Sequence, residues 1–225
     1  MTKRFRATAA VDDLSLQAAP GEVVALLGPN GAGKSTTFLC LAGMLRPDGG
    51  TIAWNETLLG ARRGRTIALI PETPEVYPNL TVWEHLAFVA ASCNLGSAWE
   101  ARANDLLDRL RLQDARDALG ASLSKGMKQK TLIVATLLVD APVFLFDEPM
   151  IGLDPAGQRE LRELVTELRA AGKAILISTH MLESAQTMAD RAIVMKAGRE
   201  IFSGPLATLD GGNHDLEGAF LRITA

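Results

Sequence analysis

The sequence has little cysteine, few aromatic residues and no long apolar segment. Its 225 residues include two cysteines and one tyrosine, and aromatic side chains make up 5% of the chain. The longest strongly apolar stretch is residues 131–139, which as a helix would be about 13 Å long, whereas the hydrocarbon core of a bilayer is about 30 Å thick. If this protein works at a membrane, we therefore expect another chain to cross it.

The scarcity of cysteine argues against a disulfide scaffold or a cysteine metal site. Cys40 and Cys93 both lie in apolar segments without metal-like neighbours, so we expect reduced core thiols in a reducing compartment. The first 17 residues contain three basic side chains, but no apolar run of signal-peptide length follows them, and two aspartates interrupt the segment. These observations predict a cytoplasmic protein.

Neither sign of charge is in excess. The chain has 23 Lys and Arg against 26 Asp and Glu, a net charge of −3, which is too close to neutral for nucleic-acid binding through bulk charge. We interpret two short basic runs, residues 3–6 and 62–65, as solvated surface. Hydrophobic residues at 48% and charged residues at 22% exclude wholesale disorder. The length of 225 residues predicts one large domain or a core with a lobe.

Short apolar runs alternate with helical patterns along most of the chain. We expect strands at residues 23–27, 66–70, 143–146, 174–177 and 192–195, and helices between several of them, including residues 35–45 and 157–171. Strands that are buried on both faces and alternate with helices are typical of an α/β fold with a largely parallel sheet.

One long interval has no convincing strand. Residues 80–139 contain three helical patterns, at residues 82–91, 98–112 and 125–138. We therefore predict a helical subdomain at about residues 80–139, packed by Trp83 and Trp99 and inserted into a core of about residues 1–79 and 140–210. The N-terminal segment and residues 51–55 are expected to add antiparallel strands at one edge.

A glycine-rich segment between a predicted strand and a predicted helix matches the phosphate-loop pattern G-x-x-x-x-G-K-[ST]. Its glycines let backbone N–H groups turn toward phosphate oxygens, and the helix adds the positive end of its dipole. We predict that Lys34 reaches the β- and γ-phosphates and that the Ser35 hydroxyl binds Mg²⁺. A turn without a ligand is the alternative, disfavoured because both flanking elements are present. The residues expected to hold the nucleotide are Gly28, Pro29, Asn30, Gly31, Ala32, Gly33, Lys34, Ser35 and Thr36.

An acidic pair ends the apolar strand at residues 143–146. Asp147 is expected to hold Mg²⁺ through water, and Glu148 to orient or deprotonate the attacking water. A solvent-facing acidic pair is the alternative reading. Together with the phosphate loop, this pair predicts a nucleoside-triphosphate hydrolase. The chain lacks the Asn-Lys-x-Asp motif that a GTPase would use to read its base.

The phosphate loop, the acidic pair and four further motifs stand in the order found in ATP-binding-cassette (ABC) ATPases, which the chain resembles over about residues 3–205. Residues 123–127, Leu-Ser-Lys-Gly-Met, resemble the signature motif LSGGQ, and residues 152–155, Gly-Leu-Asp-Pro, resemble the D-loop. His180 follows Ser-Thr and resembles the switch histidine. Glu72 stands at the Q-loop position, and Phe5, 29 residues before Lys34, resembles the aromatic that stacks on adenine.

The resemblance implies a P-loop NTPase (RecA-like) core and a head-to-tail dimer with two ATP molecules between protomers. The phosphate loop of one chain would face Ser124 and Gly126 of the other, which begin an apolar helix whose free N–H groups suit a γ-phosphate. The resemblance also assigns nucleotide contacts to Asp154 and Glu72 and a γ-phosphate contact to His180.

The chain departs from the usual motifs at three positions. Lys125 and Met127 replace Gly and Gln in the signature, a variant that resembles bacterial cassettes paired with ABC-2-type exporter membrane subunits. Glu72 replaces the Q-loop Gln; its carboxylate adds charge beside the metal, and this either tunes hydrolysis or is tolerated. Residues 216–221 resemble the short closing helix of the same subgroup, expected at about residues 214–225.

Three further side chains were considered for structural and functional roles. We interpret His85 and His214 as surface or partly packed histidines. Tyr77, between two prolines, is either an anchor of its loop or a contact for the cytoplasmic coupling helix of a membrane partner.

The leading hypothesis is an ATPase subunit, peripheral on the cytoplasmic face of the membrane, that drives an integral-membrane transporter subunit and pairs with a second copy of itself. ATP binding would close the dimer, and hydrolysis would reopen it. A non-transport ABC ATPase acting on nucleic acid or ribosomes is the alternative, but neither a coiled-coil insertion nor a second cassette is visible. A third hypothesis is a regulatory nucleotide-binding module that does not hydrolyse ATP. We expect the membrane subunit, and not this chain, to determine which substrate is transported.

Overall fold

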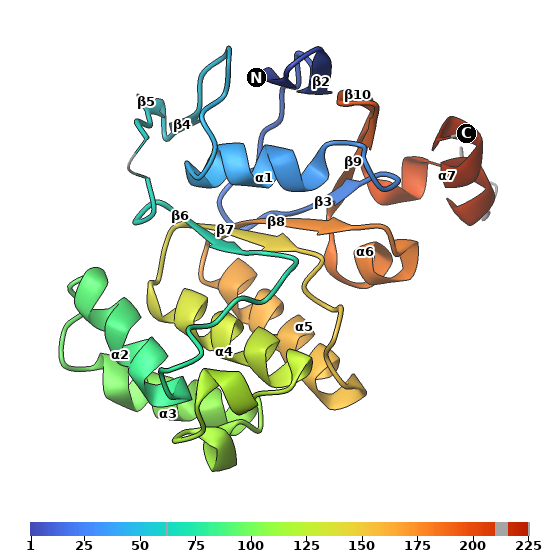
Figure 1. The fold of residues 1–225 in the computed structure, drawn as a ribbon. Coiled ribbons are helices and arrows are strands. Elements are labelled where there is room, and N and C mark those ends of the chain that lie inside the picture. Colours follow the sequence, from blue (N-terminus) through green and yellow to red (C-terminus); the bar gives the residue numbers. More distant parts are fainter. Residues whose placement is uncertain (62, 210–215, 225) are drawn as a thin grey trace.

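The computed structural model describes residues 1–61, 63–209 and 216–224 (Figure 1). A six-stranded sheet lies between helix α1 (Lys34–Ala42) on one face and the helices of residues 82–170 on the other. All neighbouring strands are parallel except β9 (Arg191–Lys196) and β10 (Arg199–Gly204), so the predicted mainly parallel α/β sheet is confirmed. The strand order is β10 (Arg199–Gly204), β9 (Arg191–Lys196), β3 (Val23–Leu27), β8 (Ala174–Thr179), β7 (Val143–Asp147) and β6 (Ile67–Ile70).

The antiparallel strands differ in place from the prediction. Strands β1 (Lys3–Phe5) and β2 (Thr8–Val11) form a separate two-stranded sheet, and β4 (Ala53–Trp54) and β5 (Thr57–Leu58) form another. The antiparallel edge of the central sheet is β10, which had not been predicted. A tight turn at Ala197 and Gly198, with φ of 49° and 81°, folds β10 back onto β9.

The long helices match the predicted patterns closely, and one short helix was missed. Periodicity did not reveal α6 because its seven residues make about two turns. The remaining helices are α2 (Val82–Ser92), α3 (Trp99–Arg109), α4 (Lys125–Leu138), α5 (Pro155–Ala170), α6 (Leu182–Met188) and α7 (Leu216–Thr224), with 3₁₀ turns at Gln113–Ala115, Gly120–Ser122 and Leu206–Thr208.

The central strands are apolar throughout because helices cover both faces of the sheet. Leu26 and Leu145 pack on the α1 side with Phe38, whereas Phe144 and Phe146 pack on the other side with residues of α4 and α5. All five of these side chains are at most 1% exposed. This double burial fixes the parallel strands side by side, so that their carboxyl ends share one edge.

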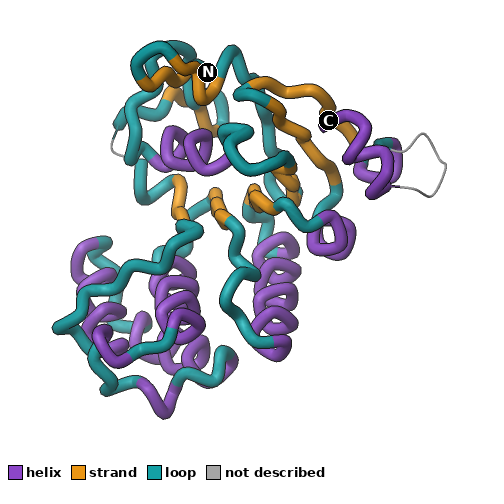
Figure 2. Tube along the Cα trace, turned by 45° about the vertical axis from the view of Figure 1, so that its right-hand side comes forward, coloured by secondary structure: helices purple, strands orange, loops and turns teal. Residues whose placement is uncertain are grey.

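Helices α2, α3 and α4 form a group below the sheet in Figure 2. Trp83 and Trp99 pack together in this group, as expected, with ring centroids 5.0 Å apart. The Arg116 guanidinium carbon lies 3.7 Å from the Trp83 ring centroid. Arg109 at the end of α3 binds Glu160 and Glu167 on α5, with its Nε 2.6 Å from Glu160 Oε1. We propose that the group is an inserted subdomain, joined to the core through this arginine.

Helix α2 begins with a capping box, which gives a stability prediction. The Thr81 hydroxyl accepts a hydrogen bond from the Glu84 N–H, and the Glu84 carboxylate accepts one from the Thr81 N–H at 2.7 Å. Replacing Thr81 with alanine removes the first of these bonds and is expected to lower the free energy of unfolding by about 1 kcal/mol. Chemical denaturation measures the change. Thr81→Ser should stay near wild type, and an equal loss in Thr81→Ser would contradict the role of the hydroxyl.

Several interpretations of single residues need correction. His85 is only 6% exposed, because its ring bonds the Tyr77 N–H and the Thr81 carbonyl oxygen, each at 2.7 Å. Arg63 is 6% exposed and donates to the carbonyl oxygens of Gly60 and Cys40, so it is not solvated surface. Both cysteines are free; Cys40 is buried as expected, whereas Cys93 is only partly buried. His214 lies outside the described residues.

Within the described ranges, no helix combines the length and the apolar composition that crossing a membrane requires.

Candidate functional site

The segment between β3 and α1 adopts backbone conformations that only glycine adopts easily. Gly28, Gly31 and Gly33 have φ of 153°, 79° and 104°. A Cβ on Gly33 would lie 2.2 Å from the Ala10 carbonyl oxygen, and one on Gly28 would lie 2.4 Å from the Met195 carbonyl oxygen. Gly31 faces open space. The loop is therefore anchored at both ends and open in the middle, which suits a cradle for phosphate.

Helix α1 starts at this loop without a side-chain cap. Its N-cap is Gly33, and the described residues supply no side-chain hydrogen bond to it. The first N–H groups of a helix have no partners within the helix, and they carry the positive end of its dipole. Ser35 and Thr36 lie in this first turn, half-buried. The arrangement favours an anion at the start of α1.

Lys34 turns its side chain back over the loop. Its Nζ donates to the carbonyl oxygens of Gly28 at 2.7 Å and Pro29 at 3.3 Å. Burial lowers the pKa of Lys34, and the nearby carboxylates of Glu148, Asp147 and Glu72 oppose that shift, in that order. The charges of these three predicted residues therefore act on the Lys34 ammonium beside the phosphate loop.

The acidic pair lies where β7 and β8 end side by side. Asp147 is 4% exposed and Glu148 7%. The Ser178 hydroxyl donates to Asp147 Oδ1, and it accepts a hydrogen bond from the Glu148 N–H at 3.0 Å. His180 Nδ1 lies 2.9 Å from Glu148 Oε1, and the His180 side chain is about half exposed. Three of the predicted site residues, Asp147, Glu148 and His180, therefore meet at one edge of the sheet.

Phe5 belongs to a hairpin that lies against the phosphate loop. Its side chain is 48% exposed, with Lys3 Nζ 5.5 Å from the ring centroid. The approach of Ala10 to Gly33 shows that β2, the partner of β1 in this hairpin, packs directly on the loop. An exposed aromatic ring on the hairpin that touches a phosphate loop is suited to stacking on a base.

The signature residues lie next to the D-loop of the same chain. The Ser124 hydroxyl caps α4 by accepting a hydrogen bond from the Met127 N–H at 3.2 Å. A Cβ on Gly126 would lie 2.6 Å from the Gly152 carbonyl oxygen, so close packing on the D-loop already requires glycine here. Between the residues described, no hydrogen bond or ion pair joins Ser124 to the phosphate loop of its own chain.

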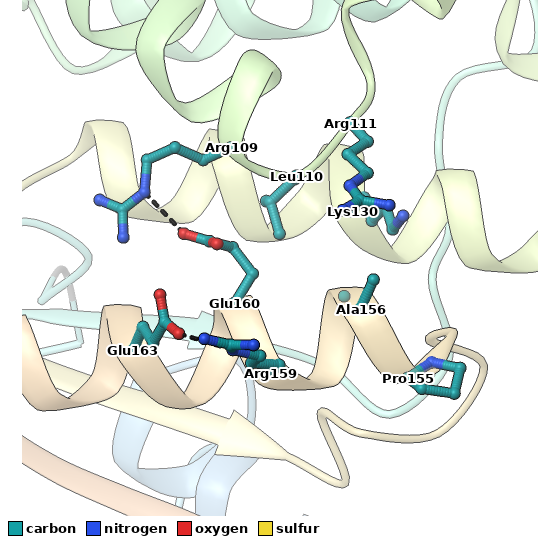
Figure 3. Close-up of a pocket in the computed structure, with 10 residues that line it drawn as sticks. Arg109, Leu110, Arg111, Lys130, Pro155, Ala156, Arg159, Glu160 and Glu163 are labelled. Carbon is teal, nitrogen blue, oxygen red and sulfur yellow. Dashed lines mark hydrogen bonds and ion pairs between the residues drawn. The ribbon is translucent and has the colours of Figure 1, made fainter.

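Asp154 is held by a lysine of the signature helix. Lys130 Nζ lies 3.0 Å from Asp154 Oδ1, and this hydrogen bond is the main reason that the pKa of Asp154 falls below its usual value. Lys130 also borders a cavity of about 440 Å³, which Arg109, Arg111 and Glu160 help to line (Figure 3). No residue of the phosphate loop lines this cavity, so the cavity does not locate the site assembled around Lys34.

Sequence reasoning did not single out Ser178 as a site residue. In the sequence, Ser178 appeared only as the first residue of the Ser-Thr-His motif that contains His180. Its contacts with Asp147 and Glu148 depend on the register of β7 and β8, in which Asp147 pairs with Ser178. No local signal in the sequence reveals a contact between residues about thirty positions apart.

The comparisons with known proteins agree on one family. A family model described as ABC transporter matches residues 11–151. The chain is 37% identical over 208 residues to the Nod factor export ATP-binding protein I of Ralstonia nicotianae, covering 91% of this chain and 65% of that protein. It is 35% identical over 201 residues to the SkfA peptide export ATP-binding protein SkfE of Bacillus subtilis, covering 88% of this chain and 84% of that one. A solved ATP binding subunit of an ABC transporter has a TM-score of 0.92 at 35% identity, covering 100% of this chain and 97% of that one.

Proposed function

The chain belongs to the ABC transporter family, and from that premise we propose that it is the ATP-hydrolysing subunit of a membrane exporter. The proposal rests above all on the meeting of Lys34, Asp147, Glu148 and His180 beside an open glycine loop. Both relatives named above are export ATP-binding proteins, which supports export. The Lys125 and Met127 variant of the signature supports pairing with an ABC-2-type membrane subunit.

ATP is the substrate that this site would bind. The backbone N–H groups of residues 28–36 would hold its phosphates, with Lys34 leaving its two carbonyl partners for the β- and γ-phosphates. Phe5 would stack on the adenine ring, because the ring is exposed and its hairpin packs on the loop. Stacking of a base on an aromatic side chain is worth about 1–3 kcal/mol.

The residues beside the loop fit Mg²⁺, which prefers oxygen ligands. The Ser35 hydroxyl and the carboxylates of Asp147 and Glu72 would hold the ion, directly or through water. When bound, Mg²⁺ would offset the negative charge of the β- and γ-phosphates. Glu72 adds a full negative charge where the family usually has an amide, and its exposed position leaves it free to approach the ion.

Glu148 is the proposed general base. Its carboxylate would take a proton from the water that attacks the γ-phosphate, a role typically worth about 10²- to 10⁴-fold in rate. His180, already in contact with Glu148 Oε1, would keep that carboxylate in place and contact the γ-phosphate.

A second copy of the chain would complete the site. Ser124 is exposed at the start of α4, and that helix end suits a phosphate that its own loop does not bring near. Ser124, Gly126 and Asp154 would therefore act on nucleotide bound to the partner protomer. ATP binding would close this dimer, and hydrolysis would reopen it.

An exposed aromatic patch on the helical group is the proposed contact for the membrane subunit. Tyr77 and Phe88 are 58% and 52% exposed, with ring centroids 5.8 Å apart. Leu119, 49% exposed, pairs through its backbone with Thr81 at the start of α2. A solvent-facing apolar patch of this kind suits a protein partner, and it would place the chain on the cytoplasmic face of the membrane.

An ATPase acting on nucleic acid or ribosomes is less favoured. Such proteins usually carry a coiled-coil insertion, whereas the longest helix among the described residues is α5, with 16 residues. The net charge of −3 also gives no electrostatic footprint for nucleic acid.

The proposal predicts Mg²⁺-dependent release of phosphate from ATP by the purified chain, measured with a colorimetric phosphate assay. GTP should be a poorer substrate, and added RNA or DNA should not stimulate turnover. ATP binding without turnover would instead support a regulatory module. Strong stimulation by nucleic acid would favour the non-transport alternative.

A further inference from the structure

Ser178 is a fully buried hydroxyl at the point where the two catalytic strands end. It is 0% exposed and pairs in register with Asp147 on the neighbouring strand. Its hydroxyl donates to Asp147 Oδ1 and accepts from the Glu148 N–H at 3.0 Å, and its carbonyl oxygen accepts from the same N–H at 3.2 Å. One side chain therefore contacts both members of the acidic pair.

The direction of these hydrogen bonds is fixed by chemistry. An ionised carboxylate can only accept, so the single hydroxyl proton of Ser178 points to Asp147. The lone pairs that remain can then accept only from a donor, and the Glu148 N–H is that donor. Among the described residues, no hydrogen bond uses the second oxygen of Asp147, Oδ2, so Ser178 orients the carboxylate while leaving one oxygen free.

The backbone of Glu148 adopts a strained conformation, so contacts from neighbouring residues are needed to keep it in place. Its φ is +48°, in the left-handed region that residues other than glycine rarely adopt. The end of β8 holds it at two points: Ser178 bonds its backbone N–H, and His180, two residues later, contacts its carboxylate. A strained residue persists only where its surroundings fix it, and such residues cluster at active sites.

We propose that Ser178 is a positioning residue of the hydrolytic site, which sets the orientation of Asp147 toward the metal and fixes the backbone of Glu148. This inference rests on the proposed function, because it assigns Ser178 to ATP hydrolysis. Hydrogen-bond partners behind metal ligands commonly affect metal affinity by about 10- to 100-fold when removed. A role limited to packing would affect stability alone.

The test compares three variants. Ser178→Ala deletes the hydroxyl, and Ser178→Thr keeps it. Thr131→Val is the matched control, because Thr131 is also 0% exposed and, within the described part of the chain, its hydroxyl bonds only the Met127 carbonyl oxygen on α4. Thermal unfolding of all three variants separates loss of folding from loss of positioning.

Two readouts do not depend on turnover. Hydrogen exchange of the Glu148 amide in the nucleotide-free protein, followed by NMR, should become roughly three- to tenfold faster in Ser178→Ala, the range expected for one lost hydrogen bond. Mn²⁺ affinity, measured by electron paramagnetic resonance with ATP bound in a Glu148→Gln background, should fall by about 10- to 100-fold. Ser178→Thr should restore both, and Thr131→Val should change neither.

Steady-state kinetics give a third readout. Ser178→Ala should lower kcat and change the KM for ATP little, since the phosphate loop is intact. The inference is overturned if Ser178→Ala matches wild type in amide exchange, Mn²⁺ affinity and kcat, or if Thr131→Val loses as much as Ser178→Ala does. A wild-type chain that binds ATP but does not hydrolyse it would overturn the proposed function instead, while the exchange and Mn²⁺ measurements would still test Ser178.

Discussion

Replacing Glu148 with glutamine is expected to slow ATP hydrolysis by about 10²- to 10⁴-fold, the range that a general base contributes. The amide is nearly the same size as the carboxylate but cannot take a proton from water. Because the phosphate loop and Lys34 are unchanged, ATP binding should persist. The variant should therefore hold ATP in the closed state and accumulate as a dimer.

Sedimentation velocity of the Glu148→Gln protein, with and without Mg·ATP, measures this directly. A shift from monomer to dimer on adding ATP would support the sandwich and the action of Ser124 on the partner's nucleotide. A persistent monomer that still binds ATP would contradict the simple homodimer, and a different cassette or the membrane subunits would then be needed for closure. Turnover is measured alongside, with Glu163→Gln as control, because Glu163 is an exposed carboxylate on α5. Near-wild-type turnover in Glu148→Gln would remove Glu148 from the role of base.

Replacing Lys34 with methionine is expected to weaken ATP binding by roughly 10- to 150-fold, which corresponds to one charge-assisted hydrogen bond. Methionine keeps much of the apolar stem of the lysine but loses the ammonium. The Gly28 and Pro29 carbonyl oxygens would lose their donor, and the three nearby carboxylates would face the phosphates without a counter-charge.

Equilibrium binding of a fluorescent ATP analogue tests this, with Lys173→Met as the matched control. Lys173 precedes β8 at the opposite edge of the sheet, and it pairs with Asp140 at 2.9 Å. Its replacement should leave nucleotide affinity unchanged. Equal affinity in wild type and Lys34→Met would mean that the ammonium does not contact phosphate, and an equal loss in both variants would point to a general effect of removing charge.

The sequence alone determined the elements whose signals are local. The strand at residues 23–27 and the helix at residues 125–138 agree with the structure at both ends. Their apolar runs and turn residues lie within a few positions of each other, so propensity and burial favour the same conformation. The backbone of the phosphate loop could also be predicted from local sequence, because positions 28, 31 and 33 adopt positive φ angles and glycine stands at each of them.

The tertiary structure alone decided how distant residues meet. Ser178 reaches Asp147 and Glu148 only through the register of two strands, and Gly126 meets Gly152 only because α4 begins beside the D-loop. The sequence predicted a surface or partly packed His85, whereas the ring is buried and accepts a hydrogen bond from the Tyr77 N–H. In each case the contact that determines the role of the residue joins positions whose spacing follows no helical or strand periodicity. Burial and hydrogen bonding across elements then fix what each side chain does.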